Sequence, residues 1–438
     1  MDVFVARQPI LDRQQRVFGY ELLFRSCLVN AFDGTDSTQA TSQVIATSFF
    51  SLGIERMVGN KRAFINFDRA LLVGDHVSLL PPQVAVVELL ESVAPDAEVV
   101  AACRRLREQG YLLALDDVIS QKRIEPLIHL ANILKVDFQR ASRTERGKLL
   151  RRGRALGIQM LAEKIEAPEE FRRALDLGFD LFQGYFFARP VVIVRREIPA
   201  FKLHYLEILQ EASRPELDYQ RLEDVIKREV ALSYKLLRYI NSAAFGWRGP
   251  IESVKQALVL LGESESRKWI SLVALPALAQ DKAEELVVQA AIRARFCESL
   301  ADWAGLGRRR TDLFFLGMFS LLDAMTDRPL EEALSAIPLA DDVHEALLGR
   351  APGNSRPAQV YRLVLAYETG QWDQLDVAAD QLGVPPGIIS DLYVDAVGWA
   401  DRVFGPDEAG AITARRPPAP RNSRTPLPGV PQCEPQKL

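Results

Sequence analysis

The stretch "GYLLALDDVIS", residues Gly110 to Ser120, ends an uncharged run on two adjacent aspartates, Asp116 and Asp117. A short uncharged run of this kind is typical of a buried strand. Neighbouring carboxylates repel each other, and beside an apolar core their charge is costly unless a cation or hydrogen-bond donors compensate it. One interpretation is that an aspartate caps the next helix. The other is a functional site at the end of the strand, and this stretch alone leaves both open.

The same pattern recurs through residues 1–195, where short apolar runs alternate with amphipathic, charge-rich segments. Two of those segments, residues 96–110 and 143–157, end in glycine, which is a usual helix stop. Repeated strand–helix alternation predicts parallel β/α units, and this number of units favours a closed, TIM-like (β/α)8 barrel. The apolar runs read "VFGYELLF", "AFINF", "VAVVELL", "YLLAL", "NILKV", "GIQMLAE" and "DLFQGYFF".

A polar residue stands at or near the C-terminal end of each apolar run. These residues are Glu21, Asn66, Glu88, Asp116, Lys135, Glu163 and Gln183. From Asn66 onward they are 22, 28, 19, 28 and 20 residues apart, about one β/α unit each, while the first interval of 45 leaves room for an extra helix at residues 37–53. The strand ends of a β/α barrel meet around one mouth. We therefore expect these side chains to lie together.

Four of these residues are carboxylates, which would repel one another strongly without compensation. Divalent cations compensate such charge, and oxygen ligands of this kind suit Mg²⁺ or Mn²⁺. Two such ions would clamp both the attacking and the leaving oxygen of a phosphodiester. The pattern predicts a metal-dependent phosphoryl site, and a plain barrel with capped or surface-exposed polar ends remains the alternative.

The sequence changes in character after about residue 202. Apolar residues then recur at helical spacing, as in "LEDVIKREVALSYKLLRYINSAAFG", and we expect an all-helical domain over residues 202–400. The last segment, residues 405–438, holds eight prolines and almost no aromatic or β-branched residues. Such a composition cannot bury enough apolar surface to offset its ordering entropy, so we expect this tail to be disordered.

Composition sets bounds on the class of protein. The 438 residues carry a formal net charge of −4, which gives no reason to expect nucleic-acid binding. Four scattered cysteines form no C-x-x-C pair, which argues against a zinc site or a disulfide framework and suits a reducing cytoplasm. We find neither a secretory signal segment nor an apolar run long enough to span a bilayer. We therefore expect a cytoplasmic protein without a membrane segment.

The first half resembles a known family at several motifs taken in order. The stretch "RQPILDRQQRVFGYELLFR", residues 7–25, resembles the opening of EAL domains, which are cyclic-di-GMP phosphodiesterases named for a Glu-Ala-Leu motif. Here that motif reads Glu21-Leu22-Leu23. The resemblance covers about residues 2–192, through "FINFD", "VELLES", "LDDV", "LKVDF", "LAEKIE" and "FQGYFFARP".

This resemblance implies hydrolysis of cyclic di-GMP to the linear dinucleotide pGpG. It implies that one divalent ion, Mg²⁺ or Mn²⁺, is ligated by Glu21, Asn66, Glu88 and Asp116. It also implies that Asp117, with Glu163 nearby, helps to hold a second ion, and that the barrel forms a homodimer.

The remaining motif residues take supporting roles by the same resemblance. Lys135 would orient or activate the attacking water, and Gln183 would support the water network around the metal. Arg25 would meet a substrate phosphate, and Gln8 would lie near the nucleotide. Glu91 would brace the loop after Asp117.

Two departures from the family pattern bear on activity. The Phe-Gly-Thr-Gly loop that usually follows the double aspartate is Val118-Ile119-Ser120-Gln121 here, without either glycine. Glycine permits backbone conformations at positive φ that these residues resist. The family's "EGVE" is "EKIE", so Lys164 follows Glu163 and could compete with a metal for nearby carboxylates.

The second half resembles HDOD domains, helical relatives of HD-type metal phosphohydrolases, over about residues 202–395. It contains only His204 and His344 and no His-Asp dipeptide, so we expect a regulatory domain that contacts a protein partner rather than a metal enzyme. Three hypotheses remain for the whole chain. It is a metal-dependent phosphodiesterase, a catalytically degenerate barrel that binds cyclic di-GMP or a protein, or an interaction scaffold that binds no nucleotide.

Overall fold

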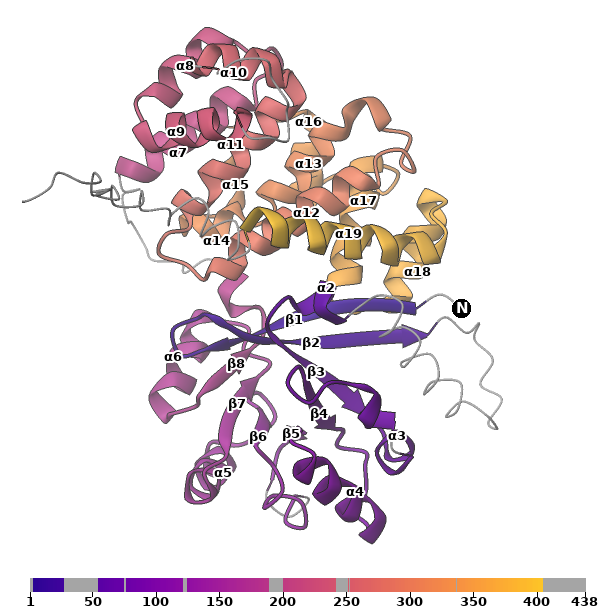
Figure 1. The fold of residues 1–438 in the computed structure, drawn as a ribbon. Coiled ribbons are helices and arrows are strands. Elements are labelled where there is room, and N and C mark those ends of the chain that lie inside the picture. Colours follow the sequence, from indigo (N-terminus) through magenta and orange to yellow (C-terminus); the bar gives the residue numbers. More distant parts are fainter. Residues whose placement is uncertain are drawn as a thin grey trace, which may run out of the picture.

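The computed structural model describes residues 3–26, 54–74, 76–120, 124–188, 200–241, 251, 253–335 and 337–404. Two parts are visible in Figure 1: a barrel built from the first half of the chain, and a helical half that lies on the side of the barrel where β1, β2 and α2 are found. The predicted combination of a β/α barrel with an all-helical second half is therefore confirmed.

The barrel is a closed sheet of eight strands in the order β1 to β8. Strands β2 to β8 are parallel to their neighbours along this sequence. The strands are β1 (Val3–Asp12), β2 (Val17–Ser26), β3 (Arg62–Phe67), β4 (Ala85–Leu89), β5 (Leu112–Val118), β6 (Ile133–Asp137), β7 (Gln159–Glu163) and β8 (Leu181–Gln183).

Strand β1 departs from the expected all-parallel arrangement, because it runs antiparallel to both β2 and β8. A parallel connection needs a crossover of a dozen or more residues, and only four residues separate Asp12 from Val17. The turn is closed by Asp12 Oδ1, which accepts hydrogen bonds from the backbone N–H groups of Gln14 and Arg16, both at 2.9 Å. The short connection therefore dictates a hairpin, which the alternation pattern did not reveal.

The helices on the outside of the barrel follow their local sequence signals. Asp96 caps α4 by accepting from Val99 N, and Ser142 caps α5 by accepting from Glu145 N. Gly157 then ends α5 at φ 69°, which confirms the helix expected over residues 143–157. The barrel helices are α2 (Ile54–Val58), α3 (Arg69–Val73), η2 (His76–Leu79), α4 (Ala97–Glu108), α5 (Arg143–Leu156), α6 (Pro168–Leu177) and η4 (Tyr185–Ala188).

The described residues from 200 to 404 form helices and their connections. The helices are α7 (Ala200–Ala212), α8 (Tyr219–Lys227), α9 (Val230–Ile240), α10 (Val254–Leu261), α11 (Glu263–Leu278), α12 (Glu284–Ser299), η5 (Gly307–Arg309), α13 (Arg310–Phe319), α14 (Leu322–Thr326), α15 (Leu330–Leu334), α16 (Asp341–Leu347), α17 (Arg356–Glu368), α18 (Trp372–Leu382) and α19 (Pro386–Phe404).

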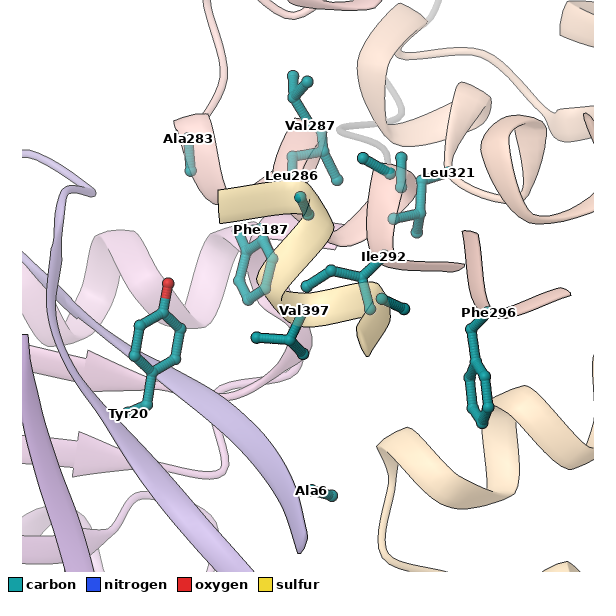
Figure 2. Close-up of a cluster of buried hydrophobic side chains, with 14 of the residues drawn as sticks. Ala6, Tyr20, Phe187, Ala283, Leu286, Val287, Ile292, Phe296, Leu321 and Val397 are labelled. Carbon is teal, nitrogen blue, oxygen red and sulfur yellow. The ribbon is translucent and has the colours of Figure 1, made fainter. Parts of the chain in front are cut away.

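One hydrophobic core runs through both halves of the molecule. Helix α19 contacts β1 and α2, and α17 also contacts β1. Figure 2 shows buried side chains of this core from both halves, among them Ala6 and Tyr20 of the barrel and Ile292 and Val397 of the helical half. The outer face of the β1–β2 hairpin is thus covered by helices that lie more than 250 residues further along the chain, as Figure 1 also shows.

Polar contacts cross the same interface. Tyr20 donates a hydrogen bond from its hydroxyl to Glu285 Oε2 of α12 at 2.9 Å, and the guanidinium of Arg7 lies over the Tyr20 ring and 3.5 Å from Asp401 of α19. The Tyr367 hydroxyl of α17 lies 3.2 Å from Val5 N and 3.1 Å from Val5 O. The helical half therefore satisfies backbone groups of β1 that face away from β2.

Some sequence predictions fall outside the described residues. They are the extra helix at residues 37–53, the last residue of the loop after Asp117, and the disordered tail at residues 405–438. Among the residues that the structure does describe, no helix is both long enough and apolar enough to cross a bilayer.

Candidate metal and phosphodiester site at the barrel mouth

The barrel interior is filled by one apolar layer below the mouth. Its buried members are Ile10, Phe64, Val86, Ala114, Ile133, Leu161 and Leu181. Successive side chains of a strand point to opposite faces, so the residue two positions further on faces inward again. From β3 to β8 that position is the polar one: Asn66, Glu88, Asp116, Lys135, Glu163 and Gln183. The strand period therefore places a polar layer directly above the apolar one.

A β-bulge explains why β5 can end on two aspartates. The pairing of β5 with β6 shifts register between Leu115 and Val118, and Asp117 has φ 47°. A bulge changes the direction in which the side chains of a strand point. Here Asp116 contacts Lys135 and Asp117 contacts Lys164. Both aspartates lie within β5, so the interpretation of this pair as a helix cap is wrong.

Lys135 lies at the centre of the polar layer. Its Nζ is 2.6 Å from Glu88 Oε1, 2.8 Å from Asp116 Oδ1, 2.9 Å from Glu163 Oε1 and 3.3 Å from Glu21 Oε2. Lys135 and Glu88 are fully buried. Four carboxylates thus surround one ammonium group, which leaves three negative charges in excess when all are ionised.

The pKa values of these groups reflect this crowding. Burial would lower the pKa of Lys135, but the carboxylates around it raise that pKa well above its ordinary value. Burial raises the pKa of Glu163 to about 8 and the pKa of Glu88 well above its ordinary value, against the attraction of Lys135. Burial acts on Glu21 in the same way, but Lys135 and hydrogen bonds from Gln183 and Asn66 lower its pKa overall.

Amide side chains connect Glu21 to the neighbouring strands. Asn66 Nδ2 donates to Glu21 Oε1 at 3.0 Å, and Gln183 Nε2 donates to Glu21 Oε2 at 2.6 Å. Gln183 also donates to Gln8 Oε1 of β1 at 3.0 Å. Gly184 follows at φ 141°, and a Cβ there would lie 2.0 Å from Ile165 O, so only glycine allows β8 to end against the β7–β8 connection.

The donor set fits a divalent cation. Five buried oxygens of the mouth have no hydrogen-bond partner among the described residues, although one of them, Glu88 Oε1, lies 2.6 Å from the ammonium of Lys135: Asn66 Oδ1, Glu88 Oε1, Glu88 Oε2, Glu163 Oε2 and Gln183 Oε1. Buried acceptors without partners are rare and costly in native proteins. Within the same described residues no three Asp, Glu, His or Cys side chains are placed so that they could hold a metal ion as they stand. Lys135 Nζ lies between the carboxylates instead. A divalent ion would give these oxygens partners and reduce the excess negative charge.

A second lysine binds the outer aspartate. Lys164 Nζ is 2.5 Å from Asp117 Oδ1 and 2.8 Å from Asp137 Oδ2. Asp137 is fully buried, and sequence reasoning did not select it as a site residue. The signal was present, because Asp137 follows Lys135 by two positions on β6 and must face the same side of the sheet.

The loop residues after Asp117 line a cavity beside the mouth. This cavity of about 410 Å³ is bounded by the ends of β4 and β5, including Glu91, Asp116, Asp117 and residues 118–120. Glu91 is exposed and lines this cavity, and its role as a loop support stays a prediction. Arg25 lies in β2 opposite Phe4, and its side chain is outside what the structure describes.

Two family models match the chain in the order of its two halves. The EAL domain model matches residues 70–190, and the HDOD domain model matches residues 198–324. The barrel is thus of the EAL class and the helical half of the HDOD class. The EAL match begins after β3, so it leaves out Gln8, Glu21 and Asn66, which the closed sheet nevertheless brings to the same mouth.

Two relatives extend the similarity to the whole chain. One is the uncharacterized protein YuxH of Bacillus subtilis (strain 168), 34% identical over 412 residues, which are 92% of this chain and 99% of YuxH. The other is the cyclic di-GMP phosphodiesterase CdgJ of Vibrio cholerae serotype O1, 34% identical over 406 residues, which are 91% of this chain and 93% of CdgJ. The chain belongs to the family of proteins in which an EAL domain is followed by an HDOD domain.

Solved structures match the chain less extensively. BlrP1 of Klebsiella pneumoniae, in complex with calcium and cyclic di-GMP, is 24% identical with a TM-score of 0.37, and the match covers 43% of this chain and 56% of that one. The EAL enzyme Bd1971, bound to cAMP and cyclic di-GMP, is 21% identical with a TM-score of 0.37, and the match covers 43% of this chain and 62% of that one.

Proposed function

We propose that this protein is a divalent-metal-dependent phosphodiesterase that hydrolyses cyclic di-GMP to pGpG. The observation that carries this proposal is the buried group of carboxylates with orphaned oxygens at the mouth of an EAL-class barrel. The whole-chain similarity to a cyclic di-GMP phosphodiesterase supports the choice of substrate.

In this proposal Glu21, Asn66, Glu88 and Asp116 hold a Mg²⁺ or Mn²⁺ ion. Bound there, the ion would supply positive charge to the phosphodiester and activate a water as nucleophile. Lys135 positions the carboxylates around it and would orient that water through them. Gln183 keeps its Oε1 free of described hydrogen-bond partners, so it can accept a hydrogen bond from a water above Glu21.

Other parts of the molecule support the same proposal. Arg25 and Gln8 would bind the nucleotide, and Glu91 would hold the loop after Asp117. The helical half would regulate the barrel, since Tyr20, which donates to Glu285 of α12, is the direct neighbour of Glu21 on β2. We further propose a protein partner for the helical half, a homodimer formed through the barrel, and a cytoplasmic location.

A second candidate function is favoured by one contact. Lys164 binds Asp117, the carboxylate that the family resemblance assigns to a second ion, and the loop that follows has no glycine. A barrel with this defect could retain cyclic di-GMP as a regulatory ligand without turning it over.

A paired assay separates the two functions. Purified full-length protein is incubated with cyclic di-GMP and either Mg²⁺ or Mn²⁺, the linear product is measured by chromatography, and binding is measured by calorimetry. The phosphodiesterase predicts linear product that disappears with Glu21→Ala or with a chelator, whereas Glu108→Ala on the exposed face of α4 retains it. Binding without product, weakened by Arg25→Ala, identifies the second function. If neither binding heat nor linear product is detected, both functions are contradicted.

A further inference from the structure

Two ammonium groups divide the acidic residues of the mouth into an inner and an outer set. The inner set has four carboxylates around Lys135, with three negative charges in excess when all four are ionised. The outer set has two carboxylates, Asp117 and Asp137, around Lys164, with one negative charge in excess. The demand for a divalent cation therefore lies with the inner set.

The outer set is built by the backbone rather than by chance contact at the surface. Asp117 has φ 47° and Lys164 has φ 57°, a left-handed region that aspartate adopts occasionally and lysine rarely. Lys164 O accepts a hydrogen bond from Gln139 Nε2 at 3.1 Å, and Asp137 Oδ1 accepts from the backbone N–H groups of Gln139 and Arg140. Strands β5, β6 and β7 thus each contribute to one fixed ion triplet.

The Lys164 side chain is 46% exposed, whereas that of Asp137 is fully buried. Removal of the ammonium from Asp137 would leave a buried carboxylate without its charge partner, which is costly. An ion that needs Asp117 as a ligand must displace this ammonium.

We infer that Lys164 takes the place of a second divalent ion, so that the mouth binds a single ion at Glu21, Asn66, Glu88 and Asp116. This inference rests on the divalent ion of the proposed function and specifies how many ions that function uses. The ammonium of Lys164 then provides the second positive charge beside the bound phosphodiester. It provides one charge where a metal ion would provide two.

The test counts Mn²⁺ ions bound to the full-length protein, by equilibrium dialysis with metal analysis and by electron paramagnetic resonance of the bound ion. We expect one ion per chain in the native protein, and two ions with mutual spin coupling in Lys164→Gly. Glycine suits the positive φ at this position, and Lys164→Asn serves as a second variant because asparagine also tolerates it. Lys164→Arg keeps the charge and should still bind one ion.

The outcomes separate this inference from the proposed function. Two coupled ions in the native protein would overturn the inference alone. One ion in both folded variants, Lys164→Gly and Lys164→Asn, would overturn it as well, because Lys164 would then not be what excludes the second ion. No ion in the native protein would overturn both the inference and the metal-dependent function.

Discussion

At the scale of single residues, two lysines, Lys135 and Lys164, pair with the carboxylates of the mouth. The polar ends of the strands could be predicted from the sequence. Alternate residues of a strand face the barrel interior, so the last inward-facing residue of each strand lies at the mouth. Their pairing could not be predicted. Whether Lys164 points to solvent or to Asp117 depends on a bulge in β5 and on positive φ angles that have no local signature in "LDDV" or "EKIE".

Lys135 should be essential to the stability of the metal-free protein. Lys135→Met leaves four carboxylates, three of them buried, without the cation that they share among the described residues, and breaking a buried ion pair in this way costs about 3 to 5 kcal/mol. The free energy of unfolding is measured by denaturant titration in the presence of a chelator. Added Mn²⁺ should recover part of the loss, since it compensates the same charge.

The control for this prediction is Lys148→Met, which removes an exposed pair with Glu145 on α5. An exposed pair contributes roughly 0 to 1 kcal/mol. Equal losses for the two variants would show that Lys135 does not neutralise the inner carboxylates.

At the scale of elements, sequence signals were reliable for helices and weaker for strands. The glycine stops after α4 and α5 could be read directly from the sequence, whereas β1 and its antiparallel pairing were missed. The missed signal was the length of the connection, since four residues after Asp12 can only close a hairpin. The need for glycine at position 184, directly after β8, could not be predicted either. It arises because the backbone of Ile165, in the connection after β7, lies close to Gly184.

Gly184→Ala should disturb the end of β8 and with it the position of Gln183. The new Cβ would lie 2.0 Å from Ile165 O at a φ of 141°, so strain and overpacking together should cost roughly 2 to 5 kcal/mol. Thermal or denaturant unfolding measures the loss.

Gly157→Ala is the matched control, because its φ is also positive and a Cβ there meets nothing within 4 Å. It should cost only the backbone strain, roughly 1 to 2 kcal/mol. A smaller loss for Gly184→Ala than for Gly157→Ala would contradict the close approach of Ile165.

At the scale of the whole molecule, the two halves share a buried polar group as well as a hydrophobic core. Burial raises the pKa of Glu285 to about 7, and the surrounding charges of Arg7, Asp401 and Lys61 and the hydrogen bond from Tyr20 partly oppose one another. Two halves were predictable from the change of periodicity near residue 202. Their fusion into one core was not, because it requires matching faces that lie more than 250 residues apart in the sequence.

The raised pKa of Glu285 predicts a pH-dependent stability. The folded protein holds this proton more tightly than the unfolded chain, so the carboxyl costs nothing at low pH, and the cost grows from about pH 4.5 to about pH 7 and is complete above that. At 1.4 kcal/mol per pKa unit the full cost is on the order of 3 kcal/mol. Glu285→Gln removes it, so the variant should gain stability over the native protein as pH rises.

Thermal unfolding at several pH values between 5 and 8 measures this gain. Glu284→Gln, the exposed neighbour on α12, should show no comparable change with pH. A constant difference between Glu285→Gln and the native protein across this range would contradict the prediction.

The hairpin of β1 and β2 packs into the barrel on one side and against helices α12, α17 and α19 on the other. A fragment cut between Ala188 and Ala200 would therefore inherit an uncovered apolar wall and should aggregate. For the same reason a chimera that borrows its helical half from a relative must borrow residues 3–26 as well. A recombinant of two such genes should therefore fold when one crossover follows residue 26 and a second one precedes the helical half. A recombinant with the second crossover alone should not.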